Sequence, residues 1–519
     1  MDILSCALAR FPRKGGEFEN KPESMSLNNL FHTDLILVHA PAVYDFRQET
    51  LLQGPLADVI PSTVEFEMYP VGFTSIAAYL ERNDYNVRID NLAYRMLRDE
   101  RFDVPKALAK LDAAVFGLDL HWLPHAQGAL AIAALLKELH PRSRILFGGL
   151  SASYYHEELI RYPFVDFVLR GDSTEEPARQ LLAALREGTP LENVDNLTWK
   201  RPDGDVVVNP LRFVPQDLDY VDVPDYRYAM RSAFKYIGLR NLIPYLEWPS
   251  YPTTMLLNTR GCTQDCAICG GSRSAYRRVC GRAAPAYRSP EKLIEDVRAI
   301  RSFSRAPIFV VHDPRMGGMQ RCRTFFRLLR AERAPNPFCF ELFFPAGDDF
   351  FDQLAGSVSS WSLEMSIESP DERLRRENGK FACSNAHIEA TIDSALRHGC
   401  QKLDLFFMAG LPHQTYADVL DTVDYCEGLA RRFGDDRRLG FFISPLGPFL
   451  DPGSRAFEEP GLGYRRLFPT LEAHRQAVLQ PTWAQMLSFE TDVMDRSTLV
   501  AATYDAAEGL NALKLRHGM

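Results

Sequence analysis

Apolar and polar positions alternate in blocks along residues 33–187, and the blocks have the lengths of strands and helices. The run DLILVHAP (34–41) is apolar throughout and ends in turn residues, which is typical of a strand buried on both faces of a parallel sheet. Further strands are predicted at YNVRID, AAVFGLDL, RILFGGL and FVDFVLRGD, separated by apolar residues at helical spacing. This alternation predicts a doubly wound α/β domain over residues 33–187.

The same alternation returns over residues 251–452. Six apolar runs indicate strands, namely TTMLLNT, PIFVVHD, CFELFFPA, SLEMSIES, KLDLFFMAG and LGFFISPL. Helical patterns lie between them, so six β/α units in series predict a partial (β/α)6 barrel. Residues 188–250 lose the pattern and are expected to form a linker with a small hairpin around PDGD. A loose arm at 1–32 and a helical C-terminal region at 453–519 complete the predicted organisation.

Composition narrows the class of protein. Apolar residues make up 46% of the 519 residues, which is enough for large cores. The formal net charge of −9 implies no overall attraction to nucleic acid. No apolar run approaches the ~18 residues of a membrane helix, and the N-terminus lacks the order of a secretory signal. We therefore expect a cytoplasmic protein with no transmembrane segment, no nucleic-acid partner and mostly reduced cysteines.

Three closely spaced cysteines form a pattern that indicates a metal or cluster site. Cys262, Cys266 and Cys269 form a C-x3-C-x2-C pattern after the first strand of the second unit, at the rim where barrel active sites lie. A structural zinc site normally has four ligands, but the one nearby thiol, Cys280, forms no second C-x2-C. Three soft thiolates suit an iron–sulfur cluster with one open iron. A zinc site or chance spacing is the alternative.

The cysteine pattern and the strands behind it resemble the radical S-adenosylmethionine (AdoMet) superfamily over about residues 250–450. SLEMSIES (362–369) is similar to the family's fourth strand, FFMAGLPHQTYADV (406–419) to its G-x-P-G-x-T turn with His413 replacing a glycine, and ISPLGPFLDPGS (443–454) to the end of its sixth strand. The resemblance implies a 4Fe–4S cluster on the three cysteines and AdoMet on the open iron. It also implies reductive cleavage of AdoMet to a 5′-deoxyadenosyl radical that abstracts hydrogen.

The resemblance further implies a set of residues in contact with AdoMet. They are Glu368, Ser369, Gly410, Pro412 and Asp313. Glu368 and Ser369 would lie near the ribose and carboxylate of AdoMet; the alternative for Glu368 is a structural role in capping or in pairing with a neighbouring arginine. The family's Gly-Gly-Glu segment is absent, and in VHDPRMGG (311–318) either His312 or Asp313 would accept from the AdoMet ammonium.

The first unit resembles the Rossmann-like cobalamin-binding domain of cobalamin-dependent (class B) radical-AdoMet enzymes. It has no G-x-G-x-x-G after its first strand. The segments ILFGGLSAS (145–153) and VDFVLRGDSTEEP (165–177) carry the resemblance, the latter in place of an R-G-E-G-E turn. Ligands of an open α/β sheet lie beyond the carboxyl ends of its strands. The residues expected to bind cobalamin there are Gly148, Gly149, Ser151, Gly171 and Glu175.

One further segment contains a histidine in a pattern similar to a known cobalt-binding string. DLHWLP (119–124) is nearly the D-x-H-x-x-G string whose histidine ligates cobalt in methionine-synthase-like domains, but it follows the third predicted strand and Pro124 replaces the glycine. A histidine in such a loop is more often satisfied by backbone groups. We expect no protein histidine on cobalt, with water or an apolar side chain beneath the ring; ligation by His121 or His125 is the alternative.

Five arginines follow the cysteines within sixteen residues, at positions 273, 277, 278, 282 and 288. They suggest an anion site or a dock for an acidic electron donor such as flavodoxin or ferredoxin, and the alternative is a solvated loop at the barrel rim.

The two resemblances together imply a methyltransferase. It would use cobalamin, AdoMet and a 4Fe–4S cluster to methylate an unactivated carbon of a small-molecule or lipid substrate. A cyclase or rearrangement enzyme without methyl transfer and a non-catalytic cobalamin or iron–sulfur sensing protein are the alternatives. No individual catalytic residue is predicted, and the sequence does not distinguish between substrates.

Overall fold

The computed structural model describes residues 33–49, 68–221, 254–380, 383–434, 436–444 and 449–518. The predicted N-terminal arm and the part of the predicted linker after residue 221 lie outside these ranges.

The first unit is a seven-stranded sheet with the order β2-β1-β3-β4-β5-β6-β7. Its strands are β1 (Thr33–His39), β2 (Val87–Asn91), β3 (Ala113–Asp119), β4 (Arg144–Gly148), β5 (Phe167–Leu169), β6 (Leu197–Lys200) and β7 (Val206–Val208). The first five run parallel, which confirms the predicted doubly wound α/β domain. The hairpin around PDGD forms β6 and β7, and because both pair antiparallel within this sheet, the sheet continues past residue 187.

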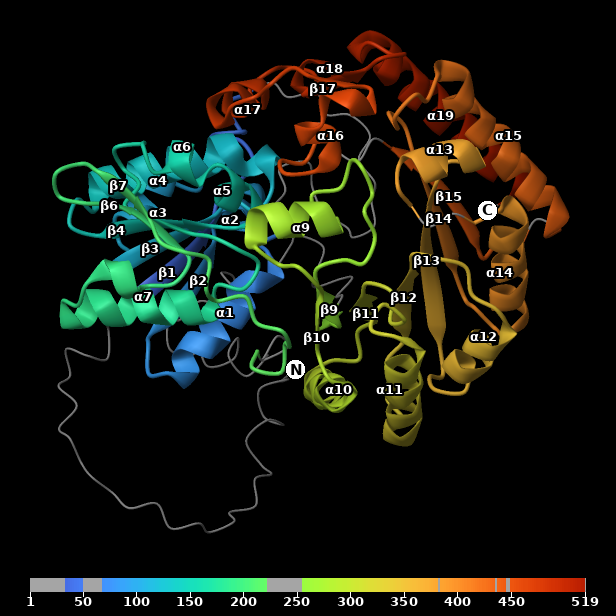
Figure 1. The fold of residues 1–519 in the computed structure, drawn as a ribbon, viewed down its shortest axis with the longest axis horizontal. Helices are drawn as coiled ribbons and strands as arrows, with labels where there is room; N and C mark the ends of the chain where they lie inside the picture. Colours follow the sequence, from blue (N-terminus) through green and yellow to red (C-terminus); the bar gives the residue numbers. More distant parts are fainter. Residues whose placement is uncertain are drawn as a thin grey trace. The chain divides into compact units, whose positions relative to one another are not determined.

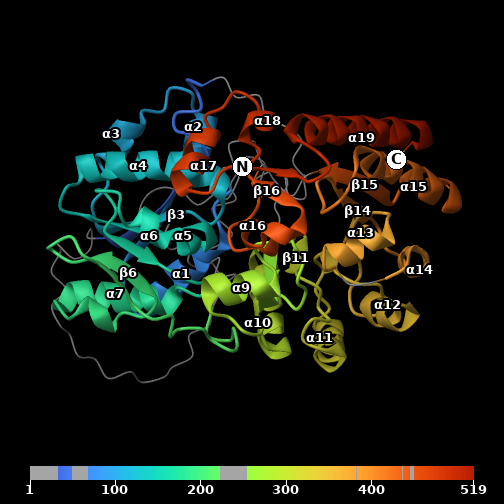
Figure 2. The same ribbon diagram turned by 45° about the horizontal axis from the view of Figure 1, so that its top comes forward.

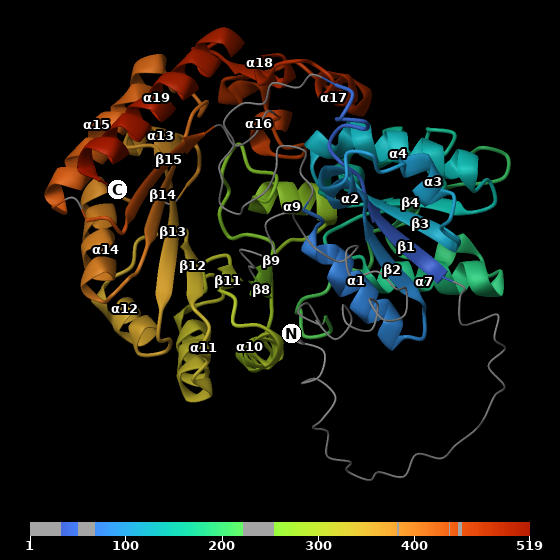
Figure 3. The ribbon, with the colours of Figure 1, turned by 180° about the vertical axis from the view of Figure 1, so that it is seen from behind.

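Helices cover both faces of this sheet (Figures 1 and 3). They are α1 (Val71–Arg82), α2 (Leu92–Arg98), α3 (Val104–Leu108), α4 (Ala126–Leu139), α5 (Leu150–Tyr154), α6 (His156–Leu159) and α7 (Glu175–Glu187), with short 3-10 turns at Leu123–His125 and Leu191–Asn193. Successive residues of β1 enter different cores: Leu35 packs with α1 and α7, whereas Ile36 packs with α4. This explains why the strands are apolar throughout, because both faces are buried.

The second unit is a six-stranded parallel sheet with the order β15-β14-β13-β12-β11-β8. Its strands are β8 (Thr254–Leu257), β11 (Ile308–Val311), β12 (Phe338–Leu342), β13 (Trp361–Glu368), β14 (Leu403–Met408) and β15 (Leu439–Ser444). Within the described residues β8 and β15 are edge strands, so the barrel is open, and all six predicted strands are confirmed. A short ladder of β9 (Thr259–Arg260) and β10 (Ala286–Tyr287) lies after β8.

The outer helices of this barrel are α10 (Pro290–Phe303), α11 (Met319–Glu332), α12 (Asp348–Ala355), α14 (Asn385–Arg397) and α15 (Tyr416–Arg432), with α9 (Arg273–Cys280) and α13 (Glu372–Glu377) in connecting segments (Figure 1). Capping residues in the sequence determine where two of these helices begin. The Ser289 side chain caps α10, with proline at the first helical position, and Thr415 with Asp418 forms a capping box on α15.

The C-terminal region contains α16 (Arg455–Glu458), α17 (Leu471–Ala477), α18 (Trp483–Met486) and α19 (Arg496–His517), and a 3-10 turn at Pro460–Leu462. It also contains an antiparallel pair, β16 (Tyr464–Arg466) and β17 (Phe489–Thr491), which the helical expectation missed because each strand has only three residues. Helix α19 packs along α15 (Figure 2).

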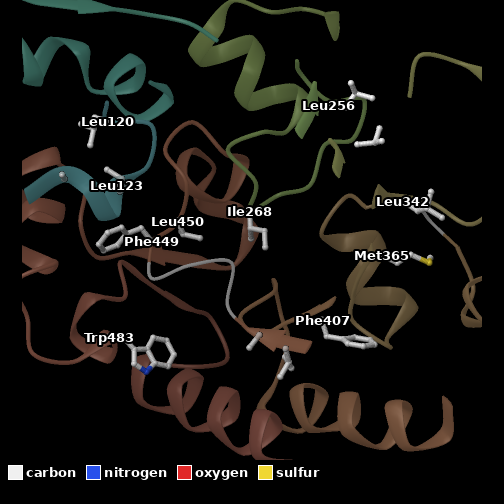
Figure 4. Packing of buried hydrophobic residues seen from close by; sticks show 14 of the residues in the cluster. Leu120, Leu123, Leu256, Ile268, Leu342, Met365, Phe407, Phe449, Leu450 and Trp483 are labelled. Carbon is white, nitrogen blue, oxygen red and sulfur yellow. The ribbon is translucent and has the colours of Figure 1, made fainter. Parts of the chain in front are cut away.

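One hydrophobic cluster joins the two units. Leu120 and Leu123 after β3 belong to the same cluster as Ile268 of the cysteine loop and Phe449 and Leu450 of the C-terminal region (Figure 4). The loops that carry candidate chemistry therefore share one packed core. Among the described helices, none combines the length and apolar character needed to cross a bilayer.

Candidate functional site

The three predicted cysteines lie in one loop, residues 261–272, between β9 and α9. Backbone amides approach their sulfurs: Gln264 N–H donates to Cys262 Sγ and Gly271 N–H donates to Cys269 Sγ, each at 3.3 Å. The loop is anchored elsewhere by Ala267 N–H, which donates to the Asn378 carbonyl at 2.6 Å. Three thiols, two of them with an amide donor to sulfur, match the donor chemistry of an iron–sulfur cluster, in which hydrogen bonds to the sulfurs tune the metal.

Burial dominates the electrostatics of this loop. It raises the pKa of the Cys269 thiol to about 12 and also raises the pKa of Cys266, which the nearby Glu368 carboxylate raises further. The ammonium of Lys380 acts in the opposite direction on all three cysteines and favours their thiolates. Neutral thiols in this setting become thiolates when a cation binds them.

Glu368 at the end of β13 contacts the residues that hold the loop. The strand is irregular before it, and Glu368 itself has a φ of 73°. Its carboxylate accepts from Asn378 Nδ2 at 2.6 Å and pairs with Lys380 Nζ at 3.2 Å. The expected alternative partner was an arginine, so the observed lysine is a correction. Ser369 is buried, and its carbonyl accepts from Arg375 at 2.6 Å.

Several buried polar atoms near the carboxyl ends of the strands have no hydrogen-bond partner among the described residues. They are Asn258 Nδ2 and Oδ1, His312 Nδ1 and Asn378 Oδ1. Asn258 follows β8 and His312 follows β11, and these strands are neighbours in register. Because a buried polar group without a partner is costly, this group of atoms fits a site that is completed by a polar ligand such as AdoMet.

Asp313 is not available to such a ligand. Its two oxygens accept from Arg315 at 2.9 and 2.6 Å, and one of them also accepts from the Phe343 amide at 3.0 Å. This corrects the expectation that Asp313 accepts from an ammonium. The neighbouring Glu341 accepts the His312 amide with one oxygen, and burial raises the pKa of Glu341 to about 7.

The turn after β14 contains Gly410 and Pro412 and packs against the C-terminal region. Gly410 has a φ of 85°, and a Cβ there would lie 3.2 Å from both Leu499 and Phe489. Its carbonyl accepts from the Tyr464 hydroxyl at 2.8 Å. The positive φ and the close contacts explain why glycine occupies this position.

A separate cavity of about 230 Å³ lies in the first unit, at the carboxyl ends of its strands, between the sheet and helices α1 and α7. Gly117, Gly148, Gly149 and Gly171 all line it together with many apolar side chains, so backbone is exposed at several points of a largely apolar wall. Three of the five residues predicted to bind cobalamin are therefore in its lining. Ser151 is not in the lining, and its hydroxyl donates to the His121 carbonyl at 3.4 Å.

Glu175 does not line the cavity either. Its buried carboxylate accepts from Ser75 at 2.8 Å and pairs with Arg260, which lies two residues before Cys262, at 2.6 Å. Next to it, Asp172 pairs with Arg282 on the far side of the cysteine loop at 2.5 Å. Both acids therefore join the first unit to the segments that flank the cysteines, which corrects the expected ligand contact of Glu175.

The arginine cluster after the cysteines separates into two groups. Arg282 and Arg288 are almost completely buried, and Arg288 pairs with Asp296 at 2.5 Å. Arg273 and Arg277 lie on α9 and are exposed. Arg282 and Arg288 are therefore structural ion-pair partners in the interior, and a solvated loop does not describe them; the anion site or donor dock stays a prediction for the exposed arginines of α9.

Two family models match the chain. One is the B12 binding domain, over residues 57–180, and the other is the Radical SAM superfamily, over residues 257–426. The chain carries the paired domains of the cobalamin-dependent radical SAM enzymes. The matched B12-binding segment contains the glycines that line the cavity, and the matched radical SAM segment contains the three cysteines, Glu368 and Gly410.

Two curated relatives are similar in sequence. The anaerobic magnesium-protoporphyrin IX monomethyl ester cyclase of Synechocystis sp. is 25% identical over 167 residues, which are 32% of this chain and only 29% of the cyclase. The cytidylyl-2-hydroxyethylphosphonate methyltransferase of Streptomyces wedmorensis is 21% identical over 404 residues, covering 70% of this chain and 73% of that enzyme.

The fold is shared with a solved structure of the radical AdoMet methyltransferase TsrM from Kitasatospora setae with tryptophan and an AdoMet analogue bound. The TM-score is 0.59 at 15% identity, covering 84% of this chain and 78% of that chain. A second TsrM structure, with cobalamin and a [4Fe-4S] cluster bound, gives a TM-score of 0.56 at 15% identity, with coverage of 79% and 75%. At this identity the likeness establishes the fold.

Sequence reasoning missed Lys380, Asn378 and Arg260. Lys380 and Asn378 come from the segment after β13 and reach the site only through the fold. Arg260 stands directly before Gly261-Cys262, and this adjacency was the one available signal.

Proposed function

We propose that this protein is a cobalamin-dependent radical AdoMet methyltransferase that methylates an unactivated carbon of a small molecule. The observation that carries the proposal is the position of Arg260. It lines the cavity of the B12-binding domain, pairs with Glu175 of that domain, and lies two residues before the first cysteine of the radical SAM loop. This buried contact between the two domains supports a cobalamin site next to the cluster site.

The described residues of both domains fit the three cofactors. Cys262, Cys266 and Cys269 would hold the 4Fe–4S cluster, and Gly148, Gly149 and Gly171 would bring backbone against cobalamin. AdoMet would contact Glu368, Ser369 and the turn of Gly410 and Pro412. When bound, the cluster supplies the electron that cleaves AdoMet, and cobalamin supplies the methyl group.

The protein's own contribution is electrostatic and steric. Lys380 places a buried positive charge near the cysteines and Glu368, where it favours thiolates and balances the negative charge of the site. Glu341, rather than Asp313, is the available carboxylate for the AdoMet ammonium, because Arg315 occupies Asp313. The hydrophobic cluster around Ile268, Leu450 and Leu120 excludes water from the space beside the cysteine loop.

The electron donor and the substrate are further parts of the proposal. Exposed Arg273 and Arg277 on α9, directly after the cysteines, suit an acidic one-electron donor such as flavodoxin or ferredoxin. On the barrel face opposite the helices, Glu341, Glu364 and Asp404 are paired in one register row. This row of polar side chains favours a small molecule with polar groups over a purely apolar lipid.

The experiment measures two products of AdoMet. Anaerobically reconstituted protein containing reduced cobalamin is given AdoMet whose methyl group is deuterated, together with a reductant. Methyl transfer predicts S-adenosylhomocysteine in proportion to retained cobalamin, together with reductive formation of 5′-deoxyadenosine. Formation of 5′-deoxyadenosine without S-adenosylhomocysteine would instead favour the cyclase or rearrangement reaction, for which the partial match to a cyclase is the supporting observation.

A matched pair of cysteine variants controls the assay. Cys266→Ala is expected to abolish 5′-deoxyadenosine, whereas Cys400→Ala removes a buried thiol outside the loop and is expected to retain it. A protein that binds both cofactors but forms neither product under any reductant would be a sensing protein, and the enzymatic proposal would be withdrawn.

A further inference from the structure

Two buried histidines and a buried aspartate meet inside the first unit. His39 ends β1, Asp119 ends β3, and His125 ends the 3-10 turn that leads into α4. The three residues are 0%, 4% and 2% exposed. One ligand atom from each lies within 4.8 Å of the other two, and His39 Nδ1 is 2.9 Å from Asp119 Oδ1. The interior of this domain therefore contains three side chains of the types that bind metal ions.

The fold brings these side chains together from two loops. Strands β1 and β3 are parallel neighbours, so their ends place His39 beside Asp119. A Cβ at Gly128, in the first turn of α4, would lie 1.8 Å from the carbonyl oxygen of Pro41 in the loop after β1. Only glycine permits this approach, which brings the turn ending in His125 against the end of β1. The rings of His39 and His125 lie 5.0 Å apart as a result.

Two of the three side chains are oriented by further contacts. The second carboxylate oxygen of Asp119, Oδ2, lies 2.7 Å from His121 Nδ1. The backbone of Ala40 hydrogen-bonds to His125. Side chains that bind a metal are typically held by such an additional hydrogen bond, which fixes the ring or carboxylate and the tautomer of the histidine. The arrangement around the three ligand atoms is therefore that of a protein metal site.

We propose that His39, Asp119 and His125 bind a divalent zinc ion. Imidazole nitrogens and a carboxylate oxygen suit zinc, which they bind at about 2.0–2.2 Å. Two ligands of one ion then lie about 3–4 Å apart, so a small movement of the side chains completes the site. Three protein ligands leave the fourth position of a tetrahedral ion to water. His121 is a positioning residue that acts through Asp119.

The ion would join the segment after β3 to the end of β1. Leu120 and Leu123 of that segment pack in the same cluster as Ile268 of the cysteine loop, so the ion stabilises a surface on which this loop packs. The inference goes beyond the proposed function, because the site consists of protein side chains and requires neither cobalamin nor AdoMet. It concerns an ion other than cobalt, and the expectation that no histidine binds cobalt stays a prediction.

The test is zinc analysis and zinc K-edge X-ray absorption of the unmodified full-length protein. Reconstitution with iron and sulfide first occupies the cysteine loop, and a chelator wash removes weakly bound zinc. We expect about one zinc ion per chain with nitrogen and oxygen neighbours only, at about 2.0–2.2 Å. Zinc with sulfur neighbours would assign the ion to cysteines and overturn the proposal. Protein that holds no zinc, even after zinc sulfate is added, would also overturn it and leave Asp119 as a hydrogen-bonded partner of histidines.

Variants distinguish this site from adventitious zinc. His39→Ala and Asp119→Ala are each expected to lose the ion, and His121→Ala to lower zinc affinity roughly 10- to 100-fold. His156→Ala is the matched control and is expected to retain zinc, because this half-buried histidine of the same domain contacts Thr198 at 3.0 Å. Circular dichroism identifies the folded variants, and zinc retained by folded His39→Ala would overturn the proposal.

The zinc test is separate from the test of the proposed function. Absorption of the unmodified protein needs no variant to fold and no turnover. A protein that binds zinc through nitrogen and oxygen but forms no cluster and retains no cobalamin would contradict the proposed function alone. A protein that retains both cofactors without such zinc would contradict only the zinc site.

Discussion

The guanidinium of Arg260 lies 2.6 Å from the carboxylate of Glu175, and both side chains are largely buried between the two domains. The same carboxylate accepts from Ser75 and from Tyr220. Burial opposes ionisation of Glu175, yet Arg260 and the hydrogen bond from Ser75 keep its pKa below the usual value. The pair therefore links the B12-binding domain to the strand that leads into the cysteine loop.

Breaking this pair is expected to cost stability. Glu175→Ala leaves the Arg260 charge buried without its partner, which typically costs about 3–5 kcal/mol. Equilibrium urea unfolding of the single variants and of Glu175→Ala/Arg260→Ala measures the coupling, and the double variant is expected to lose less than the sum. Glu192→Ala, which breaks an exposed pair with Arg201, is the control and is expected to cost at most about 1 kcal/mol. Strict additivity at the buried pair would contradict this account.

Neighbouring glycines in the loop after β4 are expected to differ in their tolerance of alanine. Gly149→Ala places a methyl group against the His121 backbone and forces an unfavourable φ, so a loss of roughly 1–3 kcal/mol or more is expected. At Gly148 the nearest atom to an added Cβ is 3.9 Å away, so Gly148→Ala is expected to remain within about 1 kcal/mol of the unmodified protein. Equal melting temperatures of the two variants would refute the steric argument.

Lys380 is expected to raise the reduction potential of the bound cluster. Its ammonium lies near all three cysteines, and a nearby positive charge stabilises the reduced, more negative state. Lys380→Met should therefore lower the potential, by on the order of 60 mV for a tenfold change in the one-electron equilibrium. Potentiometric titration followed by paramagnetic resonance measures this, with exposed Lys106→Met as the control that should leave the potential unchanged.

Asp451 is expected to have the opposite effect. Its carboxylate accepts the Gly270 amide at 2.9 Å, burial raises its pKa to about 6, and its charge raises the pKa of Cys269. Asp451→Asn preserves an acceptor for Gly270 but removes the charge, so the cluster potential should rise at about pH 8. A fall in potential in this variant, or a rise in Lys380→Met, would show that charge is not the determining factor.

The acidic row of the barrel predicts a pH dependence of stability. Burial, followed by the charges of Glu341 and Asp404, raises the pKa of Glu364 from 4.5 to about 8. The folded protein then binds more protons than the unfolded chain between these two values, so stability falls as pH rises through this window, by at most ~1.4 kcal/mol per pH unit. Glu364→Gln should flatten the fall in melting temperature between about pH 5 and pH 8. Exposed Glu138→Gln is the control, and an unchanged pH profile in Glu364→Gln would contradict the shift.

Much of the fold was predictable because strand and helix patterns in this chain are long and local. The runs at 34–41 and 362–369 predict β1 and β13, and the C-x3-C-x2-C spacing predicts one loop of three thiols. Contacts across domains were not predictable in the same way. Glu175 was expected at a ligand but pairs with Arg260, 85 residues away, and Lys380 approaches the cysteines only after the chain has passed four more strands.

The arginines also show that contacts with residues distant in sequence could not be predicted. Arg282 and Arg288 look like members of a surface patch because only their neighbours in sequence are visible, whereas their partners Asp172 and Asp296 decide that they are buried. The Asp119–His121 contact is between residues close in sequence. The cavity that both residues line, and the approach of the Gly149 backbone from the loop after another strand, are visible only in the fold.

The measurement that tests the central claim most directly is anaerobic reconstitution with iron, sulfide and hydroxocobalamin, followed by metal analysis and an absorption spectrum of the desalted protein. The account predicts that one protein retains both cobalamin and a cluster, that Cys266→Ala loses the cluster alone, and that Gly149→Ala loses cobalamin preferentially. A protein that retains the cluster but no cobalamin would contradict the account, and methyl transfer through cobalt would then have no basis.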